Sequence, residues 1–352
     1  MINILGLALY GPLAASHRVR LGQYRKGLLA LGVDLHVQSL LGNDYLQSRF
    51  RGGRVPFAPV LDAGVDRLRL LLSERRFDAA IVHCELFPLV PGWLERAVLR
   101  MPYIYDFDDA FYLRYRSGRL GALSSLLGGK FDRVMRGAAA ITAGNAHLAA
   151  YAGALNPKVT VLPSVVDTDH FSPSTRHESP VFTVGWIGSP STATYLQSLV
   201  VPLRRLGETT PARLVVVGGK APQIENVDVF EIPWSEDREV DLINTFDVGV
   251  MPLPDDEWAR GKCGFKLVQY MACGVPVVAS RVGANSDLVT PECGFLAATD
   301  DQWVDALKHL REQPLVRQRM GESARKRVLD AYSLKSNLPV LASVIQKVVG
   351  RV

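Results

Sequence analysis

The sequence predicts an α/β protein of two Rossmann-like domains, each with its own parallel sheet. The chain has 352 residues, about twice the length of an ordinary domain. Short β-rich apolar runs alternate with longer helical patterns, which is typical of βαβ units whose sheet is buried on both faces. The segment Phe171–Pro180, FSPSTRHESP, separates two such series, and its serines and prolines indicate a linker.

The expected elements follow in order. In the first half we predict strands at Ile2–Leu9, Val33–Ser39, Ala79–His83, Tyr103–Tyr105, Ala139–Thr142 and Thr160–Leu162, and helices at His17–Leu31, Asp62–Arg75, Leu120–Arg136 and Ala146–Ala152. The second half restarts with strands at Phe182–Ile187, Arg213–Val217, Val227–Ile232, Val248–Met251 and Val275–Ala279. We therefore place the domains at 1–172 and 173–335, and expect helical residues 336–352 to pack back on the first domain.

Composition narrows the class of protein. Apolar residues make up 48% of the chain, as in a globular protein with large cores. The four cysteines form no C-x-x-C pair, which disfavours a zinc site or a disulfide framework and fits a reducing compartment. No basic residue precedes the apolar start, and no apolar run reaches about 18 residues. We expect a cytoplasmic protein with neither a signal peptide nor a transmembrane helix.

The charge is unevenly distributed. Residues 1–170 contain 20 Lys and Arg against 14 Asp and Glu, a net charge of +6, whereas residues 171–352 have 20 against 21, a net charge of −1. Either this asymmetry is incidental, or the first half meets an anionic partner such as a lipid headgroup layer at the inner face of a membrane. A nucleic-acid partner is not expected, because no docking motif is present.

A lysine occupies an unusual place in the stretch Asp255–Lys266, DDEWARGKCGFK. Lys266 falls in the first turn of a predicted helix, where the macrodipole disfavours a cation. The misfit is explained if an anion is shared between the ammonium and the backbone amides. Arg260 and Lys262 lie just before it, next to glycines that allow close approach of a ligand. We interpret the stretch as a diphosphate cradle; the alternative is a solvated lysine.

The residues around this lysine resemble a known family. The segment Phe246–Ser280, above all KLVQYMACGVPVVAS, is similar to the donor-binding region of family 4 glycosyltransferases, which have the two-domain GT-B fold. VFTVGWIGSPSTATYL (Val181–Leu196) resembles the start of their second domain, and ASHRVRLGQY, YDFDDAFY and AGNAHLAAYA resemble a subgroup of their first domains.

The resemblance implies a reaction and its partners. It implies transfer of a sugar from a nucleotide-diphosphate sugar to a glycan or lipid-linked acceptor, with retention of configuration and with neither a metal nor another cofactor. Cell-surface polysaccharide, glycolipid or lipopolysaccharide synthesis is the expected setting. Donor and acceptor are expected in a cleft between the two sheets.

By position, Lys266 corresponds to the family's diphosphate-binding lysine, and we expect Arg260 and Lys262 to assist it. Gln269 replaces the second glutamate of the E-x7-E motif, while Gly261 stands where the first is expected. The basic residues that usually follow the first strand of the second domain are also absent. The predicted donor-binding set is Gly11, Gly188, Ser189, Ser191, Trp234, Gly264, Phe265, Lys266, Leu267 and Gln269.

Polar residues at strand ends of the first domain form the predicted acceptor side. They are Arg18, His83, Glu85, Asp106, Asp108 and Asp109. His83 has the alternative of a satisfied core histidine, and Arg18, like Arg20, that of a solvated helix face. Asp106 and Asp108 have the D-x-D spacing of metal-dependent transferases with another, one-domain fold, so a metal there is one alternative; we instead expect one of the three carboxylates to bind acceptor hydroxyls and the others to cap a helix. On the donor side, Trp234 is either a base-stacking or a packed side chain. The helix expected at Leu120–Arg136 either covers the sheet or presses on a membrane.

Two other functions remain open from the sequence. One is a nucleotide-sugar epimerase with the same fold, which needs no acceptor. The other is a non-catalytic nucleotide-binding scaffold, which the glutamate missing at Gly261 keeps under consideration.

Overall fold

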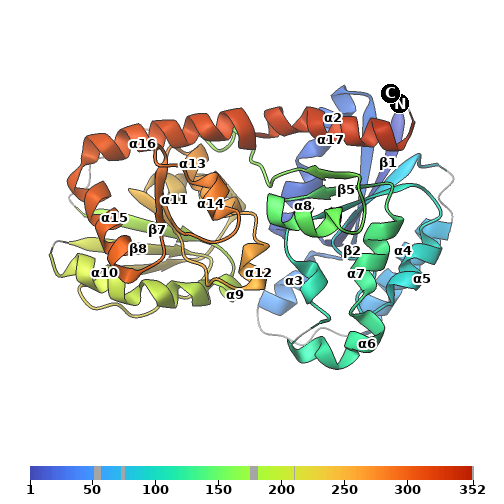
Figure 1. Cartoon of the computed structure of the whole chain (residues 1–352), viewed down its shortest axis with the longest axis horizontal. Helices are drawn as coiled ribbons and strands as arrows, with labels where there is room; N and C mark the ends of the chain where they lie inside the picture. The colour runs from blue at the N-terminus through green and yellow to red at the C-terminus, as the bar shows by residue number, and fades with distance from the viewer. Residues whose placement is uncertain (51–56, 73–75, 117, 175–180, 210, 351–352) are drawn as a thin grey trace. The chain divides into compact units, whose positions relative to one another are not determined.

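The structure, a computed structural model, describes the chain except for residues 51–56, 73–75, 117, 175–180, 210 and 351–352 (Figure 1). It divides into two compact units: unit 1 comprises Met1–Ser164 and Asn337–Val352, and unit 2 comprises Val165–Ser336. The sequence placed these boundaries after residues 172 and 335. The linker expected at Phe171–Pro180 thus begins inside unit 2, and its residues 175–180 lie outside the described residues.

Unit 1 contains a six-stranded sheet in the order β2-β1-β3-β4-β5-β6. All its strand pairs are parallel, which confirms the prediction. The strands are β1 (Ile2–Tyr10), β2 (Val33–Leu41), β3 (Ala79–His83), β4 (Tyr103–Phe107), β5 (Ala140–Ala143) and β6 (Val159–Val161). The strand order reverses between β1 and β3, so the loops after these strands leave the sheet where open α/β sheets bind ligands.

The helices of unit 1 differ from the prediction in one important place. They are α1 (Ala15–His17), α2 (Tyr24–Ala30), α3 (Asn43–Phe50), α4 (Phe57–Leu72), α5 (Gly92–Val98), α6 (Ser124–Leu127), α7 (Lys130–Gly137) and α8 (Ala146–Gly153). The single helix predicted at Leu120–Arg136 is wrong. A 3-10 turn (Gly118–Leu123), α6 and α7 replace it, because the adjacent glycines Gly128 and Gly129 disfavour a continuous helix.

Unit 2 has a second six-stranded parallel sheet, in the order β12-β11-β10-β7-β8-β9. Its strands are β7 (Phe182–Ile187), β8 (Ala212–Val217), β9 (Val227–Ile232), β10 (Val248–Met251), β11 (Val277–Ser280) and β12 (Gly294–Ala297). The strand order reverses between β7 and β10. The segments that follow these two strands therefore meet at the ligand-binding edge of this sheet.

The helices of unit 2 surround this sheet (Figure 1). They are α9 (Pro190–Ala193), α10 (Val200–Gly207), α11 (Glu239–Asn244), α12 (Glu257–Arg260), α13 (Phe265–Ala272), α14 (Asn285–Leu288), α15 (Asp300–Glu312) and α16 (Pro314–Arg327). The last helix, α17 (Leu334–Val348), continues into unit 1, where Leu338 packs so closely on Gly27 that an added Cβ would lie 2.5 Å from its Cδ2.

Two strand glycines of unit 2 allow aromatic rings to lie against the sheet. A Cβ at Gly185 would come within 2.0 Å of the Phe246 ring, and one at Gly249 within 2.2 Å of the Tyr270 ring. The Tyr270 hydroxyl accepts a hydrogen bond from the backbone N–H of Ile187 at 2.8 Å. Tyr270 belongs to α13 and Ile187 ends β7, so this packing fixes α13 relative to the end of β7.

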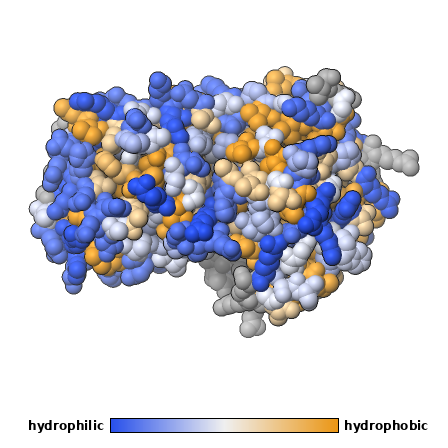
Figure 2. Space-filling model, viewed as in Figure 1, coloured by the Kyte–Doolittle hydropathy of each residue, from blue (hydrophilic) through white to orange (hydrophobic). Residues whose placement is uncertain are grey.

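The surface mixes apolar and polar residues. In the view of Figure 2, apolar side chains gather over α17 and the adjoining part of unit 1, and hydrophilic side chains gather over α7. Among the helices that the structure describes, none has the length and apolar character needed to cross a bilayer.

Candidate functional site

Lys266 lies in the first turn of α13, as the sequence predicted. The residue before this helix, Gly264, has a left-handed backbone with φ of 66°, and a Cβ there would lie 2.1 Å from Leu288. Only glycine fits this position without strain. The first three residues of α13 differ in burial: Phe265 and Lys266 are half-buried, whereas Leu267 is buried in the core.

Trp186, which the sequence analysis missed, supports the Lys266 ammonium. Lys266 Nζ lies 4.4 Å from the centroid of the Trp186 ring, within the range of a cation–π interaction. The indole itself is buried between two glycines: a Cβ would lie 2.6 Å from it at Gly188 and 3.0 Å from it at Gly219. Gly188, predicted to face a donor, is thus also required by the tryptophan. The contact of Trp186 with Lys266 was not predicted, because Trp186 lies in the apolar strand β7 and is read in sequence as a core residue.

The electrostatics of Lys266 are unusual. Burial, with the positive charge of Lys262 as a second cause, lowers its pKa to about 7. A lysine in this state gains from a bound anion, because the anion both compensates lost hydration and restores the protonated form. No carboxylate is recorded as an ion-pair partner of Lys266 in the described part of the chain. Lys266 is therefore a partly buried lysine whose charged form is disfavoured in the free protein.

A second group lies on the same face of α13. Gln269 comes three residues after Lys266, is buried, and donates from Nε2 to a carboxylate oxygen of Glu239 at 3.3 Å. The same oxygen of Glu239 accepts from the indole N–H of Trp234 at 2.9 Å. Glu239 begins α11 and is buried. Glu239 was not predicted as a site residue. The one sequence feature that could have indicated it is its place five residues after Trp234, which was predicted to bind the donor. Trp234 also packs against the core.

The other residues predicted for this region are more exposed. Ser189 and Ser191 share a hydroxyl hydrogen bond of 2.9 Å in the turn that opens α9. Arg260 is exposed and pairs with Asp255 at 2.7 Å, and Lys262 Nζ lies 5.7 Å from the Trp258 ring centroid. Arg260 is therefore paired with Asp255, whereas the positive charge of Lys262 contributes to the lowered pKa of Lys266.

In unit 1 the structure corrects the role of Asp106. This carboxylate is buried and accepts from Arg20 at 2.5 and 3.1 Å, from His83 Nδ1 at 2.8 Å and from the Thr142 hydroxyl at 2.6 Å. Burial opposes ionisation, but the Arg20 guanidinium outweighs it and holds the pKa of Asp106 well below its usual range. Asp106 therefore holds β4, β5 and the first helices together and is not free for acceptor hydroxyls. Arg20, for which a solvated helix face was one alternative, is buried.

Glu85 is corrected in the same way. It is buried, and its oxygens accept from the Arg114 guanidinium at 2.8 Å, the Tyr115 hydroxyl at 2.6 Å and the Lys130 ammonium at 2.6 Å. Lys130 also pairs with Glu95 at 3.0 Å. These bonds join the segment after β3 to α5 and α7. Glu85 thus anchors the domain rather than presenting an acceptor-side carboxylate.

His83, Cys84 and Asp108 form a compact polar cluster at the ends of β3 and β4. With Nδ1 bonded to Asp106, the His83 ring directs Nε2 toward the Cys84 thiol at 3.0 Å and Asp108 at 3.9 Å. Their ligating atoms lie within 4.8 Å of one another, a spacing that can hold a metal ion. Burial, with the negative charges of Asp108 and Asp106 in addition, raises the pKa of the Cys84 thiol. Asp108 and Asp109 remain half-buried at this edge.

Gly11 lies in the loop after β1, and Arg18 begins the π-helical turn Arg18–Gly22 that follows α1. A Cβ at Gly11 would lie 2.6 Å from the side-chain oxygen of Asn43, and this oxygen accepts from the Leu13 N–H at 3.1 Å. Arg18 donates to the carbonyls of Pro12 and Leu13 at 2.8 and 3.0 Å. Both residues therefore shape the loop itself. Their predicted contacts with ligands remain predictions.

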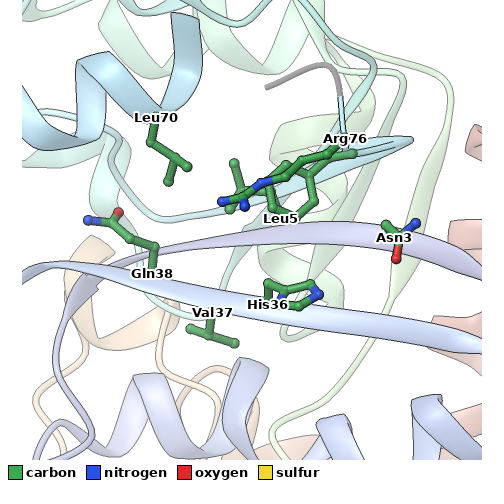
Figure 3. Close-up of a pocket in the computed structure, with 8 residues that line it drawn as sticks. Asn3, Leu5, His36, Val37, Gln38, Leu70 and Arg76 are labelled. Atoms are coloured by element: carbon green, nitrogen blue, oxygen red, sulfur yellow. The ribbon is translucent and has the colours of Figure 1, made fainter. Parts of the chain in front are cut away.

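A hollow in unit 1 lies away from these residues. It has a volume of about 450 Å³ and is lined by Asn3 and Leu5 of β1, by His36 and Gln38 of β2, and by Leu70 of α4, with Arg76 across it (Figure 3). None of the predicted site residues lines it. It lies beside the first half of β1, whereas the candidate residues lie beyond the carboxyl ends of the strands.

Part of the chain is similar in sequence to known proteins. Residues 181–313 match the family model described as glycosyl transferases group 1. A curated relative, MMP alpha-(1->4)-mannosyltransferase from Mycolicibacterium hassiacum, is 36% identical over 95 residues. That match covers 25% of this chain and 23% of the relative, so the chain spans about a quarter of the curated protein it matches.

Solved structures match the whole chain in fold. Sucrose-phosphate synthase from Thermosynechococcus elongatus has a TM-score of 0.71 at 13% identity, with 100% of both chains covered. Anabaena HepE in complex with UDP-glucose has a TM-score of 0.69 at 13% identity, again with 100% of both chains covered. The lipopolysaccharide outer core galactosyltransferase WaaB has a TM-score of 0.63 at 12% identity, covering 98% of this chain and 99% of that chain.

Proposed function

We propose that the protein transfers a sugar from a nucleotide-diphosphate sugar to a glycan or lipid-linked acceptor, since residues 181–313 match the family model of the group 1 glycosyl transferases and the whole chain has the GT-B fold. The observation that carries the proposal is the Lys266 ammonium, held over Trp186 at the start of α13 with a pKa of about 7. A diphosphate supplies the negative charge that this site lacks.

The proposed mechanism depends on stabilising the negative charge that develops on the leaving phosphate. When the bond between the sugar's anomeric carbon and the β-phosphate oxygen breaks, negative charge grows on that phosphate. A preorganised ammonium near this oxygen stabilises it more in the transition state than in the ground state. The acceptor hydroxyl then forms the new bond on the same face of the sugar and gives its proton to the departing phosphate. This retaining route needs no separate base.

Gln269 and Glu239 are proposed to hold the nucleoside. Gln269 occupies the position of the family glutamate that binds the ribose hydroxyls, and Glu239 places a carboxylate beside it at 3.3 Å. A hydroxyl that donates to a carboxylate makes a stronger bond than one that meets two neutral groups. Trp234, fixed by the same carboxylate, offers a ring near the base.

Replacing Glu239 with glutamine tests this assignment. We expect KM for the donor to rise about tenfold with little change in kcat, since a charge-assisted hydrogen bond contributes roughly 1.5–3 kcal/mol and acts equally on ground and transition states. Steady-state kinetics at saturating acceptor provide the measurement. Glu225→Gln, an exposed change in the same unit, is the matched control. An unchanged KM in Glu239→Gln would remove Glu239 from the donor site.

Acceptor binding is assigned to unit 1. Asp108 and Asp109 remain half-buried just after the carboxyl end of β4. The similar structure WaaB is a lipopolysaccharide outer core galactosyltransferase, which supports the proposal of a role in cell-surface polysaccharide or glycolipid synthesis. We propose a cytoplasmic enzyme, with peripheral contact at the inner face of a membrane. Lys266 and the amides of α13 provide the positive charge for the leaving group without a metal.

Chelation tests the metal-independent route. Incubation with EDTA followed by its removal should leave the transfer rate unchanged, because the proposed leaving-group stabilisation uses protein cations. The assay is released nucleotide with a panel of sugar nucleotides. If activity is lost and returns with zinc or manganese, His83, Cys84 and Asp108 become the residues to substitute first.

A panel of sugar nucleotides tests the function as a whole. UDP-glucose is the first probe, because HepE is recorded in complex with it. Binding should raise the melting temperature by mass action, and transfer should appear when an acceptor is added. Conversion of the sugar nucleotide to its epimer in the absence of an acceptor would instead indicate an epimerase. Binding with neither hydrolysis nor transfer, across the panel of donors and acceptors, would indicate a scaffold.

A further inference from the structure

The outer layer of unit 1 carries an exposed apolar stripe. Leu61, Val65, Leu68 and Leu72 recur on α4 at helical spacing, so they share one face, and each exposes between 37% and 56% of its surface. An amphipathic helix of a globular protein normally turns such a face to the core. Here the face is turned outward in the described structure.

The core does not need this face, because a different side of α4 holds the helix in place. Arg67 is fully buried and donates to the backbone carbonyls of Ala8, Gln38 and Leu86 at 2.6, 2.8 and 3.1 Å. Leu71, one turn later, is also buried. The exposed stripe is therefore surplus to the packing of unit 1, which makes it a candidate contact surface.

The neighbouring helix extends the apolar surface. α5 contacts α4 and exposes Trp93 by 54% and Leu94 by 39% (Figure 1). We name the set Leu61, Val65, Leu68, Leu72, Trp93 and Leu94 the α4–α5 surface. A tryptophan beside leucines suits the boundary between hydrocarbon and headgroups, where an indole has both an apolar and a polar environment.

Arginines border the α4–α5 surface on one side. α5 packs on α7, with Gly92 against the Lys130 backbone, and the two segments expose Arg96, Arg100, Arg133 and Arg136. The acids of these segments are already engaged: Glu95 pairs with Lys130, and Asp132 pairs with Arg116. Hydrophilic side chains gather over α7 in Figure 2. On α4 itself the exposed acids are Asp62 and Asp66, and Asp66 pairs with Arg69 at 3.1 Å. With the four arginines of α5 and α7, the exposed charged groups around the surface therefore have a net positive charge.

We propose that the α4–α5 surface docks unit 1 on an anionic lipid surface. The apolar residues enter the headgroup boundary while the arginines meet lipid phosphates. A second copy of the chain is a poorer partner, because a symmetric contact would bring the same arginines of both copies together. The inference deepens the proposed function, on which it rests for a lipid-linked acceptor, and it goes beyond it by naming the docking residues.

Vesicle sedimentation of the full chain tests the proposal. The protein should pellet with phosphatidylcholine vesicles that contain phosphatidylglycerol, much less with pure phosphatidylcholine, and less as salt is added. Leu61→Gln with Leu68→Gln, and separately Arg133→Gln with Arg136→Gln, should each lower the partition coefficient about tenfold or more. Leu315→Gln, an exposed leucine of unit 2, should pellet like the wild type.

Three results would overturn the proposal. The wild type stays in solution with anionic vesicles, the α4–α5 variants pellet as the wild type does, or sedimentation velocity shows a dimer that Leu61→Gln with Leu68→Gln dissolves. A cooperative thermal melt without ligand, at the melting temperature of the wild type, shows that the variants are folded. The UDP-glucose melting shift is measured separately. Lys266→Ala should lose that shift and still pellet, so failure of donor binding and failure of lipid docking are separate outcomes.

Discussion

Lys266→Ala should reduce sugar transfer by about a hundredfold to a thousandfold, because removal of one preorganised donor to a developing oxyanion has effects of this size. The same variant should lose the UDP-glucose melting shift. In the absence of ligand it should melt no lower than the wild type, since the free protein holds Lys266 half-buried with an unfavourable charge. Initial rates and thermal melts on one preparation make both measurements.

Two matched variants show whether position or charge matters. Lys326→Ala removes an exposed lysine from α16 of the same unit and should change neither rate nor melting shift. Lys262→Ala removes the neighbouring charge that lowers the pKa of Lys266, so its effect should be smaller than that of Lys266→Ala. Wild-type activity in Lys266→Ala would rule out the proposed diphosphate site.

The fold could be predicted from the sequence because the central strands of both sheets are buried on two faces. Such strands appear as short apolar runs, and Ala79–His83, Phe182–Ile187 and Val248–Met251 were predicted with their observed bounds. The short strand β12 was missed, since Gly294–Ala297 offers four residues and no alternation. The helix predicted at Leu120–Arg136 was wrong because apolar residues recur at helical spacing on both sides of Gly128. This spacing was given more weight than the helix-breaking glycines between α6 and α7.

The candidate site was only partly readable. Lys266 and Gln269 were found because they lie in a continuous motif. Trp186 and Glu239 were missed because they reach α13 from β7 and α11, and such contacts depend on tertiary packing. Asp106 and Glu85 show the opposite error, in which residues predicted for the site are structural. A carboxylate at a strand end looks the same in sequence whether it meets a ligand or, as here, a buried Arg20 or Lys130.

Donor affinity should depend on pH through Lys266. Below its pKa of about 7 the free protein already carries the ammonium, so this residue makes affinity independent of pH there. Above that pH the free lysine is neutral, and a diphosphate, which raises the pKa in the complex, binds with uptake of a proton. The apparent Kd should then rise by up to about tenfold for each pH unit until the pKa of the complex is reached.

UDP-glucose titrations between about pH 6 and about pH 9 test this, since both phosphates of its diphosphate stay ionised and their charge does not change over this range. Calorimetry in buffers of different ionisation enthalpy should show proton uptake above neutral pH. Trp186→Leu removes the ring 4.4 Å from the ammonium, so the pKa of free Lys266 should fall and the onset of weakening should move to lower pH. An affinity that stays constant through this range, with no proton uptake, would mean that Lys266 is not the group that meets the diphosphate.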